Sequence, residues 1–532
     1  MTSPVTSADT AIRPDQVIDS AALAVGGRRQ TWTLIVACAG VALVISSMVA
    51  LNTALGDIAT GTSATQTQLT WVVDGYTLAL ACLLLPGGAI GDRYGRREAL
   101  LIGLAIFAAA SLSPVFFDTP LQIIVARAVA GAGAAFVMPA TLSLLTAAYP
   151  SEDRVKAVGI WAGVAGSGAT VGMLGSGVLL HLWAWQSIFW AFFICAAALF
   201  VLTLTVASSR DSNAAPVDWP GAALIGAAAA LFVFGVIEAP ARGWSNPVVY
   251  GCLAAGLALA GLFGFVELRR RQPVLDVRLF GRPDFTVGSA TIVVFFAANF
   301  GFMYLLMQYF QLILGYSAIT TALAFAPLMV GIIALSVVSF WYLPRLGLRL
   351  VVFVGLLLLS LGFFCMRGVG VDSSYVDAAW PLVVLSVGIG LLTAPATSAI
   401  MGAVPDDKQG VASAVNDAAR EIGAALGIAV AGSILAARYT DRLRTELAAL
   451  PEPVRGPASD SLAQALKMAD MAGPQGRQLA ELSKTAFLHS MQSSLLVIGI
   501  IVGIAAVLIG FWAPGRDGQQ LAVVRRLTRR SS

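Results

Sequence analysis

Apolar runs of about twenty residues recur along the whole chain, and they constrain its fold more than any other feature. A helix of that length crosses the hydrocarbon core of a bilayer. Of the 532 residues, 58% are hydrophobic and 12% are charged, and the mean hydropathy is +0.82. A soluble protein of this size could not bury that much apolar surface. We therefore expect an all-α integral membrane protein with about fourteen transmembrane helices. The expected spans are residues 32–54, 70–90, 99–117, 121–147, 156–181, 187–207, 219–237, 247–266, 286–312, 321–343, 350–366, 380–402, 411–436 and 487–512.

Basic residues gather in every second connection between these spans. They are Arg28, Arg29, Arg93, Arg96, Arg97, Arg154, Lys156, Arg269, Arg270, Arg271, Arg345, Arg349, Lys408, Arg525, Arg526, Arg529 and Arg530. The short connections on the opposite side carry mostly Asp57, Asp118, His181, Glu238 and Asp372. The positive-inside rule then places both termini in the cytoplasm. An odd number of spans would break this segregation.

The composition also argues against several kinds of protein. A net charge of +4 gives no reason to expect a nucleic-acid partner. The five cysteines are scattered through apolar runs, so we expect no disulfide framework. His181 and His489 lie at predicted outer ends of spans, which disfavours a haem-binding redox enzyme. No Gly-Lys pair is present for a phosphate-binding loop of an ATP-driven pump. We expect no enzymatic activity, no cofactor and no metal.

An internal repeat organises the chain into two halves. Arg93-x-Gly95-x-Arg97 links the second and third spans, and Arg345-x-Gly347-x-Arg349 links the tenth and eleventh. Two parallel six-helix bundles with two extra helices between them explain this spacing. The expected segments are a cytoplasmic tail at 1–31, a bundle at 32–207, a linker with two transmembrane helices at 208–268, a cytoplasmic loop at 269–285, a second bundle at 286–512 with an extracellular helical hairpin at 437–486, and a cytoplasmic tail at 513–532.

The short charged loop at residues 88–97 carries the strongest motif. Its pattern G-x-I-G-D-R-x-G-R-R resembles the signature loop between helices 2 and 3 of the major facilitator superfamily. That resemblance implies a transporter with the major facilitator fold. Glycines permit tight turns, and an acid can face the positive N-terminus of a neighbouring helix. We expect the loop to latch the cytoplasmic side of the two bundles, with a purely topogenic positive loop as the alternative. The latch residues are Gly88, Asp92, Arg93, Gly95, Arg96 and Arg97.

Arg127 lies in the middle of the fourth apolar span. A buried arginine costs about 2.5–3.5 kcal/mol on insertion scales, so it needs a carboxylate or water beside it. Its spacing to Gly131 resembles the fourth helix of the same family, which implies a role in proton coupling. A structural arginine that snorkels to an interface is the alternative. The family's usual acid in helix 1 is Ser47 here, so we expect either that Asp74 or Asp57 replaces it or that the coupling stoichiometry differs.

Asp74 lies about one turn inside the outer end of the second span, between Trp71 and Tyr76. This run resembles the same helix of QacA-like multidrug exporters. An acid at this depth can attract a lipophilic cation, which would stack on the aromatic rings. We expect Asp74 to bind substrate or couple it to protons. A helix-end acid that only caps the helix is the alternative.

The fifth span contains small residues at helical spacing. Glycines four residues apart let helices approach closely and rock against one another. The run resembles the antiporter motif of exporting family members, although Met173 replaces the motif's proline and Ser176 one of its glycines. Exchange is therefore favoured over symport, with plain helix packing as the alternative. The motif residues are Gly159, Gly163, Gly168, Gly172, Gly175 and Gly177.

The thirteenth span carries Asn416, Asp417, Arg420 and Glu421, which share one side of a helix. They resemble the Asn-x-x-x-Arg-x-x-Gly run of fourteen-span drug exporters. Asp417 is expected to form a switchable pair with Arg420 or Glu421 that contributes to proton coupling, or the charges simply neutralise each other near the cytoplasmic end. The start of this span is also a candidate docking site for Asp92, and we group Arg420 with the latch.

The ninth span matches the same exporter family. Phe296, Asn299, Phe300, Gln308 and Tyr309 would line an aromatic, weakly polar substrate cavity, together with Asn52 of the first span. Aromatic stripes of this kind also arise from ordinary helix packing.

The resemblance covers residues 32–512 and identifies the chain as a member of the fourteen-helix drug/proton antiporter family of the QacA/EmrB type. It implies proton-driven efflux of amphipathic, cationic drugs by alternating access. We expect a monomer in a bacterial inner membrane whose partners are the bilayer, a small amphipathic substrate and protons. An exporter of one endogenous amphiphile (a lipid, a siderophore or a self-made antibiotic) and a membrane sensor without transport remain alternatives.

Overall fold

A computed structural model describes residues 14–62, 64, 66–116, 119–209, 218–270, 273, 275–405, 408–446, 458–459 and 462–521. These residues form helices and connecting turns, without a strand among them. The helices are α1 (Pro14–Ala50), α2 (Leu55–Thr62), α3 (Gln66–Tyr94), α4 (Arg96–Leu112), α5 (Pro120–Ala148), α6 (Ser151–Leu182), α7 (Gln186–Thr203), α8 (Trp219–Arg242), α9 (Pro247–Arg269), α10 (Pro283–Gln308), α11 (Ala318–Ala324), α12 (Ala326–Val337), α13 (Ser339–Met366), α14 (Tyr375–Gly402), α15 (Gln409–Glu446), α17 (Leu462–Met471) and α18 (Arg477–Trp512).

Thirteen of the described helices are long and apolar enough to cross a membrane. A fourteenth apolar helix, α12, has only 12 residues. The predicted span at 321–343 is therefore not one continuous helix. It breaks at Phe325, directly before Pro327 in the first turn of α12, and again at Val338. Proline lacks an amide hydrogen and its ring clashes with the preceding turn, which explains the first break.

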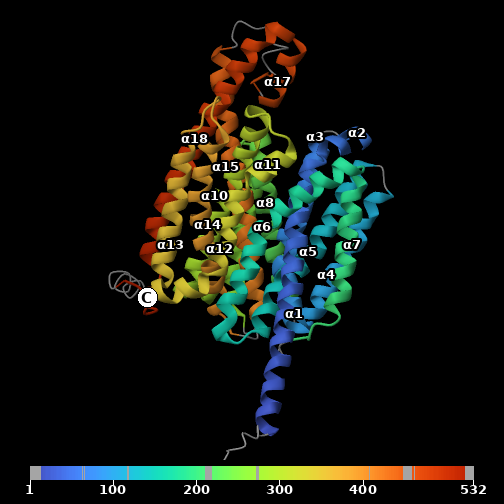
Figure 1. The fold of residues 1–532 in the computed structure, drawn as a ribbon, viewed down its shortest axis with the longest axis vertical. Helices are drawn as coiled ribbons and strands as arrows, with labels where there is room; N and C mark the ends of the chain where they lie inside the picture. The colour runs from blue at the N-terminus through green and yellow to red at the C-terminus, as the bar shows by residue number, and fades with distance from the viewer. Residues whose placement is uncertain are drawn as a thin grey trace, which may run out of the picture.

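The helices pack as two groups that meet along a seam (Figure 1). In the first group α5 packs on α3 and α4, and α1 packs on α6. In the second group α10 packs on α15 and α14, and α13 packs on α14 and α18. The groups touch each other through α3 and α5 against α15, and through α6 against α11, α12 and α14. The two extra helices form a pair in which α8 lies against both α3 and α15.

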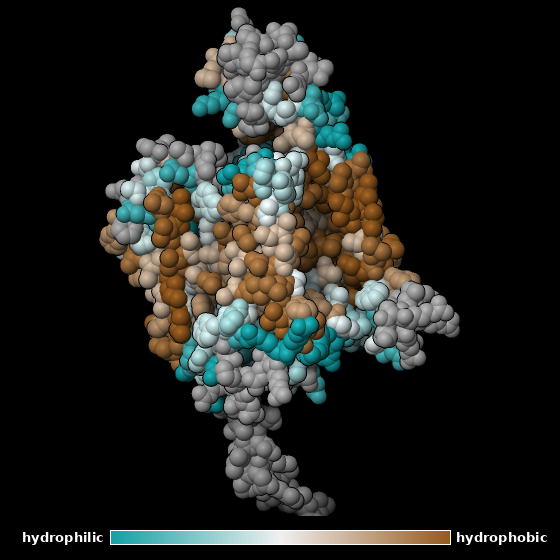
Figure 2. Space-filling view, turned by 180° about the vertical axis from the view of Figure 1, so that it is seen from behind, coloured by the Kyte–Doolittle hydropathy of each residue, from teal (hydrophilic) through white to brown (hydrophobic). Residues whose placement is uncertain are grey.

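On the side of the bundle shown in Figure 2, a belt of apolar side chains separates two polar ends. The first turns of α1 and the segment that follows α18 lie toward the same face, at the bottom of Figure 1. An even number of crossings accounts for that arrangement. The Gly95 turn between α3 and α4 lies on this face, and so does the Gly347 turn, which forms a kink inside α13 next to Arg516 in the segment after α18. Asp118, Arg271 and the four tail arginines lie outside the described residues.

A helical projection rises from the opposite face (Figure 1, top). It consists of the end of α15, α17 and the beginning of α18. Tyr439 donates a hydrogen bond to the carbonyl of Ala458 over 3.2 Å, and Leu443 and Leu462 are buried inside the projection. The predicted helical hairpin at 437–486 thus has helical structure where it is described, while residues 447–457 and 460–461 lie outside the described residues. The same holds for residues 210–217 of the predicted linker.

Candidate functional site

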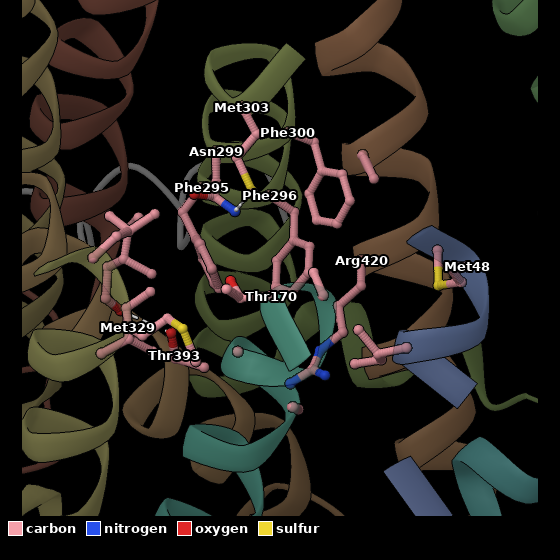
Figure 3. Close-up of a pocket in the computed structure, with 18 of the residues that line it drawn as sticks. Met48, Thr170, Phe295, Phe296, Asn299, Phe300, Met303, Met329, Thr393 and Arg420 are labelled. Atoms are coloured by element: carbon pink, nitrogen blue, oxygen red, sulfur yellow. Dashed lines mark hydrogen bonds between the residues drawn. The ribbon is translucent and has the colours of Figure 1, made fainter. Parts of the chain in front are cut away.

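A cavity lies at the seam, midway along the bundle (Figure 3). Its wall is largely apolar, and side chains from both helix groups contribute. The aromatic, sulfur-containing and polar residues of the wall are Met48, Met138, Thr170, Phe295, Phe296, Asn299, Phe300, Met303, Met329, Thr393, Arg420 and Glu421. Pockets of this kind, apolar with a few convergent polar groups, are typical of small-molecule sites.

Arg420 is the only basic residue among the cavity's lining residues. Its side chain leaves α15 and passes below the ring of Phe296 toward α6 (Figure 3). The guanidinium carbon lies 4.9 Å from the ring centroid of Trp161 and 5.2 Å from that of Phe296. Arg420 is 2% exposed, and none of its three guanidinium nitrogens has a hydrogen-bond acceptor among the described residues. Two aromatic faces therefore hold this cation in place.

Two buried carboxylates flank Arg420 on the same helix. Asp417 is fully buried and accepts a hydrogen bond from the Asn416 amide over 3.0 Å. Glu421 is 3% exposed and lines the cavity. Neither carboxylate accepts a hydrogen bond from Arg420. The predicted pairing with Arg420 is therefore absent in this structure, because the guanidinium lies against aromatic rings instead.

Arg127 finds its partners without any acid, contrary to the prediction. Its Nη1 donates to the Ser47 hydroxyl over 2.9 Å, and its Nη2 donates to the Ser47 carbonyl over 3.0 Å. Its Nε donates to the carbonyl of Val72 over 3.2 Å. The guanidinium carbon lies 4.3 Å from the ring centroid of Tyr76. Neither Asp74 nor Asp57 replaces the missing helix-1 acid, since Ser47 and two backbone carbonyls satisfy the arginine.

The residues around Asp74 face away from the cavity. Trp71 stacks on Phe234 of α8 with ring centroids 5.8 Å apart. Tyr76 is fully buried, and its hydroxyl donates to the carbonyl of Val44 over 3.1 Å. Trp71, Asp74 and Tyr76 are all missing from the cavity's lining. The expected binding group on this helix therefore lies outside the central cavity, where α8 covers α3.

The other predicted binding residues divide between the cavity and the outer ends of helices. Asn299 and Phe300 line the cavity, as does Phe296. Asn52 donates to the carbonyl of Val49, Gln308 to that of Tyr304, and Tyr309 to that of Gly370. These last three residues do not line the cavity. The resemblance to the exporter family pointed to these three residues, but they lie nearer the outer ends of their helices than the cavity does. Asp57 lies in the short helix α2, between α1 and α3.

The charged loop joins the two helix groups at the bottom face. Asp92 is 7% exposed, and its carboxylate accepts hydrogen bonds from the backbone N–H groups of Gly410 (2.8 Å) and Val411 (3.0 Å), at the start of α15. Arg96 forms an ion pair with Asp92 over 2.9 Å. The predicted contact between Asp92 and this helix is thus present. A carboxylate at a helix N-terminus is stabilised by the unpaired N–H groups there.

Close backbone contact surrounds this docking point. A Cβ atom on Gly88 would lie 2.5 Å from the carbonyl oxygen of Gly410. Arg93 packs on the ring of Tyr94. Arg420 lies ten residues beyond Gly410, roughly 15 Å along the helix, so it belongs to the cavity and not to the latch as predicted.

Both helix groups contain the repeated turn, but only the turn of the first group has an acidic residue, Asp92, that contacts the other group. Gly95 (φ 120°) and Gly347 (φ 76°) both adopt a conformation that favours glycine. Arg97 donates to the carbonyl of Val206 after α7, and Arg349 donates to that of Ala513 after α18. The repeat aligns Asp92 with Pro344, which has no acceptor side chain.

The small residues of α6 fit against both groups. A Cβ atom on Gly172 would lie 2.6 Å from the carbonyl oxygen of Ser46 on α1. Gly168 also approaches α1, at Ile45, while Gly159 and Gly163 approach α12 and Gly177 approaches α11. Gly175 differs from the others, since a Cβ atom there would have nothing within 4 Å. Five of the six predicted glycines therefore lie at close helix contacts.

Sequence reasoning missed two residues of the site. Ser47 was noted only as a departure from the family pattern, although it is the main partner of Arg127. Trp161 was not considered, because an aromatic residue in an apolar run carries no signal of its own. Its position about three turns into a glycine-lined helix was the available hint.

Comparisons with known proteins agree with this architecture. The family model described as Major Facilitator Superfamily matches residues 35–428. Multidrug resistance protein Stp of Mycobacterium tuberculosis is 32% identical over 434 residues, which cover 80% of this chain and 80% of that protein. Methyl viologen resistance protein SmvA of Salmonella typhimurium is 30% identical over 492 residues, with 91% and 98% covered. The structure of the proton:xylose symporter XylE superposes with a TM-score of 0.58 at 14% identity, covering 94% of this chain and 99% of that chain.

Proposed function

The chain belongs to the Major Facilitator Superfamily, and we propose that it is a proton-driven exporter of amphipathic, cationic compounds. Relatives with drug-resistance and efflux names, which match over most of this chain, support a drug-efflux transporter. The thirteen apolar helices of the described residues make this chain a multi-pass membrane protein. The geometry of the site supports the two finer parts of the proposal, which are that protons drive transport and that the substrate is a cation.

The observation that carries the proposal is the charge inside the cavity. Asp417 and Glu421 are buried beside a single arginine that neither of them engages. A buried carboxylate without a cation is unfavourable, so it takes up a proton or a positively charged ligand. Two ligands that compete for the same carboxylate are exchanged, because each leaves when the other binds. This competition is the basis of antiport.

The seam supplies the movement that exchange requires. The cavity lies between the two helix groups, so rocking of one group against the other would open it to alternate faces. The Asp92 contact with α15 closes the bottom face in the present structure. The close approach of Gly159 on α6 to Ser336 on α12 lies across the seam, and small residues at such a contact let the two groups rock against each other.

We also propose the orientation and setting of the protein. The bottom face carries the Arg93–Arg97 and Arg345–Arg349 turns, so the positive-inside rule makes it the cytoplasmic face. Both termini then lie in the cytoplasm, and the α17 projection lies outside the cell. The protein acts as a monomer in a bacterial inner membrane and uses the proton gradient in place of a cofactor.

An exporter of one endogenous amphiphile is the second candidate. A tetracenomycin C resistance and export protein of Streptomyces glaucescens, 28% identical over 517 residues, favours it. Transport of a panel of unrelated cations at similar rates would exclude it.

Transport by purified protein in liposomes tests the proposal. An imposed pH gradient should drive accumulation of the cationic dye ethidium, and Glu421→Gln should reduce that rate at least tenfold. Glu267→Gln is the matched control, because Glu267 is equally buried but lies on α9, away from the cavity. Ethidium transport at the same rate with and without the pH gradient would contradict the proposal. An equal reduction of the transport rate in the two variants would also contradict it.

A further inference from the structure

Arg420 is the one basic group in the cavity, and nothing described in the structure accepts its hydrogen bonds. We infer that Arg420 selects cations that also carry an acceptor oxygen, such as a carbonyl or phenolate, on a planar aromatic ring system. This inference rests on the proposed function and narrows its substrate class. It concerns the Arg420 guanidinium, whereas the proposed exchange of proton and cation concerns the carboxylates.

Two aromatic rings and burial hold the Arg420 guanidinium at the cavity wall. A guanidinium is planar and carries five N–H groups in that plane. Trp161 and Phe296 both lie within cation–π distance of its central carbon. None of its three nitrogens has an acceptor among the described residues, so their N–H groups are available. An acceptor that reaches one of these groups therefore finds a donor that is already positioned and removed from water.

The protein's own carboxylates do not accept hydrogen bonds from Arg420 in this structure. Asp417 accepts from Asn416, and neither Asp417 nor Glu421 accepts from Arg420. A buried arginine without acceptors is unfavourable, since each unmade hydrogen bond to a charged group costs about twice as much as a neutral one. A ligand oxygen at Arg420 relieves this deficit. It also leaves the carboxylate of Glu421, on the next residue of α15, available for the ligand's positive charge.

The remaining wall of the cavity suits a flat ring system. Phe296 and Phe300 are stacked with centroids 5.8 Å apart and planes 18° apart, and Phe295 lies beside them (Figure 3). Met48, Met303 and Met329 supply polarisable, adaptable side chains around these rings. The Asn299 amide oxygen also has no hydrogen-bond donor among the described residues. A flat aromatic ligand can lie along the phenyl rings and still present one edge to Arg420.

Three tricyclic compounds separate the contributions of oxygen and charge. Aminoethyl-anthraquinone carries both the acceptor carbonyls and the cation, aminoethyl-anthracene lacks the carbonyls, and hydroxyethyl-anthraquinone lacks the cation. Their binding to full-length protein in lipid nanodiscs is measured by equilibrium dialysis, with empty nanodiscs as the blank for lipid partitioning. The wild-type protein should bind aminoethyl-anthraquinone roughly tenfold to a hundredfold more tightly than aminoethyl-anthracene, as expected for a hydrogen bond to a charged donor.

Substitutions then assign the preference to Arg420. Arg420→Met keeps an apolar stem between the two rings and removes every donor, so the two amines should bind about equally. Arg420→Gln, which stays polar, is measured alongside it so that the result does not depend on one variant folding. Phe300→Leu is the matched control in the same wall, and it should weaken both amines while preserving their ratio. Gel filtration and thermal unfolding establish that each variant is folded.

The outcomes distinguish this inference from the proposed function. Equal wild-type affinities for the two amines, or an undiminished ratio in a folded Arg420 variant, would overturn the role of Arg420. Equal affinities for aminoethyl-anthraquinone and hydroxyethyl-anthraquinone would instead contradict the cationic substrate and leave the role of Arg420 standing.

Discussion

Replacing Asp92 by asparagine should open the bottom face of the protein, which we propose is its cytoplasmic side. In the present structure this carboxylate accepts hydrogen bonds from Gly410 and Val411 at 2.8 and 3.0 Å, and it pairs with Arg96. Asparagine has one acceptor oxygen in place of two and has no charge. It therefore keeps at most one of the two hydrogen bonds to α15, and that bond is weaker because the acceptor is neutral. It also loses the favourable interaction of a negative charge with the N-terminus of α15.

The magnitude follows from these contacts. A hydrogen bond to a charged group contributes about 1.5–3 kcal/mol, and Asp92 is nearly fully buried, so solvent screens little of it. Losing one such bond and weakening the other should destabilise the closed cytoplasmic side by about 2–3 kcal/mol. That free energy corresponds to a shift of roughly 30- to 150-fold toward the state that is open to the cytoplasm.

Distance measurements between spin labels test this shift. Labels at Tyr94, at the end of α3, and at Lys408, just before α15, report the separation of the two helix ends in a background without native cysteines. Asp92→Asn should move most of the distribution to longer values. Arg97→Gln is the control, because Arg97 contacts Val206 within its own helix group. The same distribution in Asp92→Asn and in the parent protein would refute the reasoning.

Two further predictions concern contacts inside the membrane. Ser47→Ala removes the hydroxyl that accepts a hydrogen bond from Arg127 and leaves three other contacts of that arginine. Thermal unfolding should therefore show that the free energy of unfolding falls by about 1–2 kcal/mol. An unchanged melting temperature would show that the hydroxyl contributes nothing. Gly172→Ala places a Cβ atom 2.6 Å from the carbonyl oxygen of Ser46 and should destabilise the protein by about 1–3 kcal/mol. Gly175→Ala, which meets open space, should leave stability nearly unchanged, and equal effects of the two alanines would count against close packing at Gly172.

Features that depend on local chemistry were predictable from the sequence. The two Arg-x-Gly-x-Arg turns predicted matching helix groups, and both turns have a glycine with positive φ and an arginine on the end of the last helix of its group. The docking of Asp92 followed from the general affinity of a carboxylate for a helix N-terminus. The break before α12 was signalled by Pro327 but was overlooked, because the apolar run continues through it.

Features that depend on packing between distant segments were not predictable. Helical spacing placed Asp417, Arg420 and Glu421 on one side of α15, but it could not show that Trp161, far away in the chain, would lie against the guanidinium. Chemical reasoning required a partner for Arg127 and suggested an acid, yet backbone carbonyls of Ser47 and Val72 serve as well. Asp74 lies at a depth that suits a binding group, but the position of α8 relative to α3 decides what it faces.

The central claim is that protons and a cationic substrate compete for the buried carboxylates of Asp417 and Glu421, of which Glu421 lines the cavity. Proton release on substrate binding measures this competition directly. Purified protein in weakly buffered detergent solution, with a pH-indicator dye, should release protons when ethidium is added. The double variant Asp417→Asn/Glu421→Gln has no carboxylate from which the dye could displace a proton, so it should release none. No release from the wild-type protein on saturation with ethidium, or equal release from the double variant, would contradict the account.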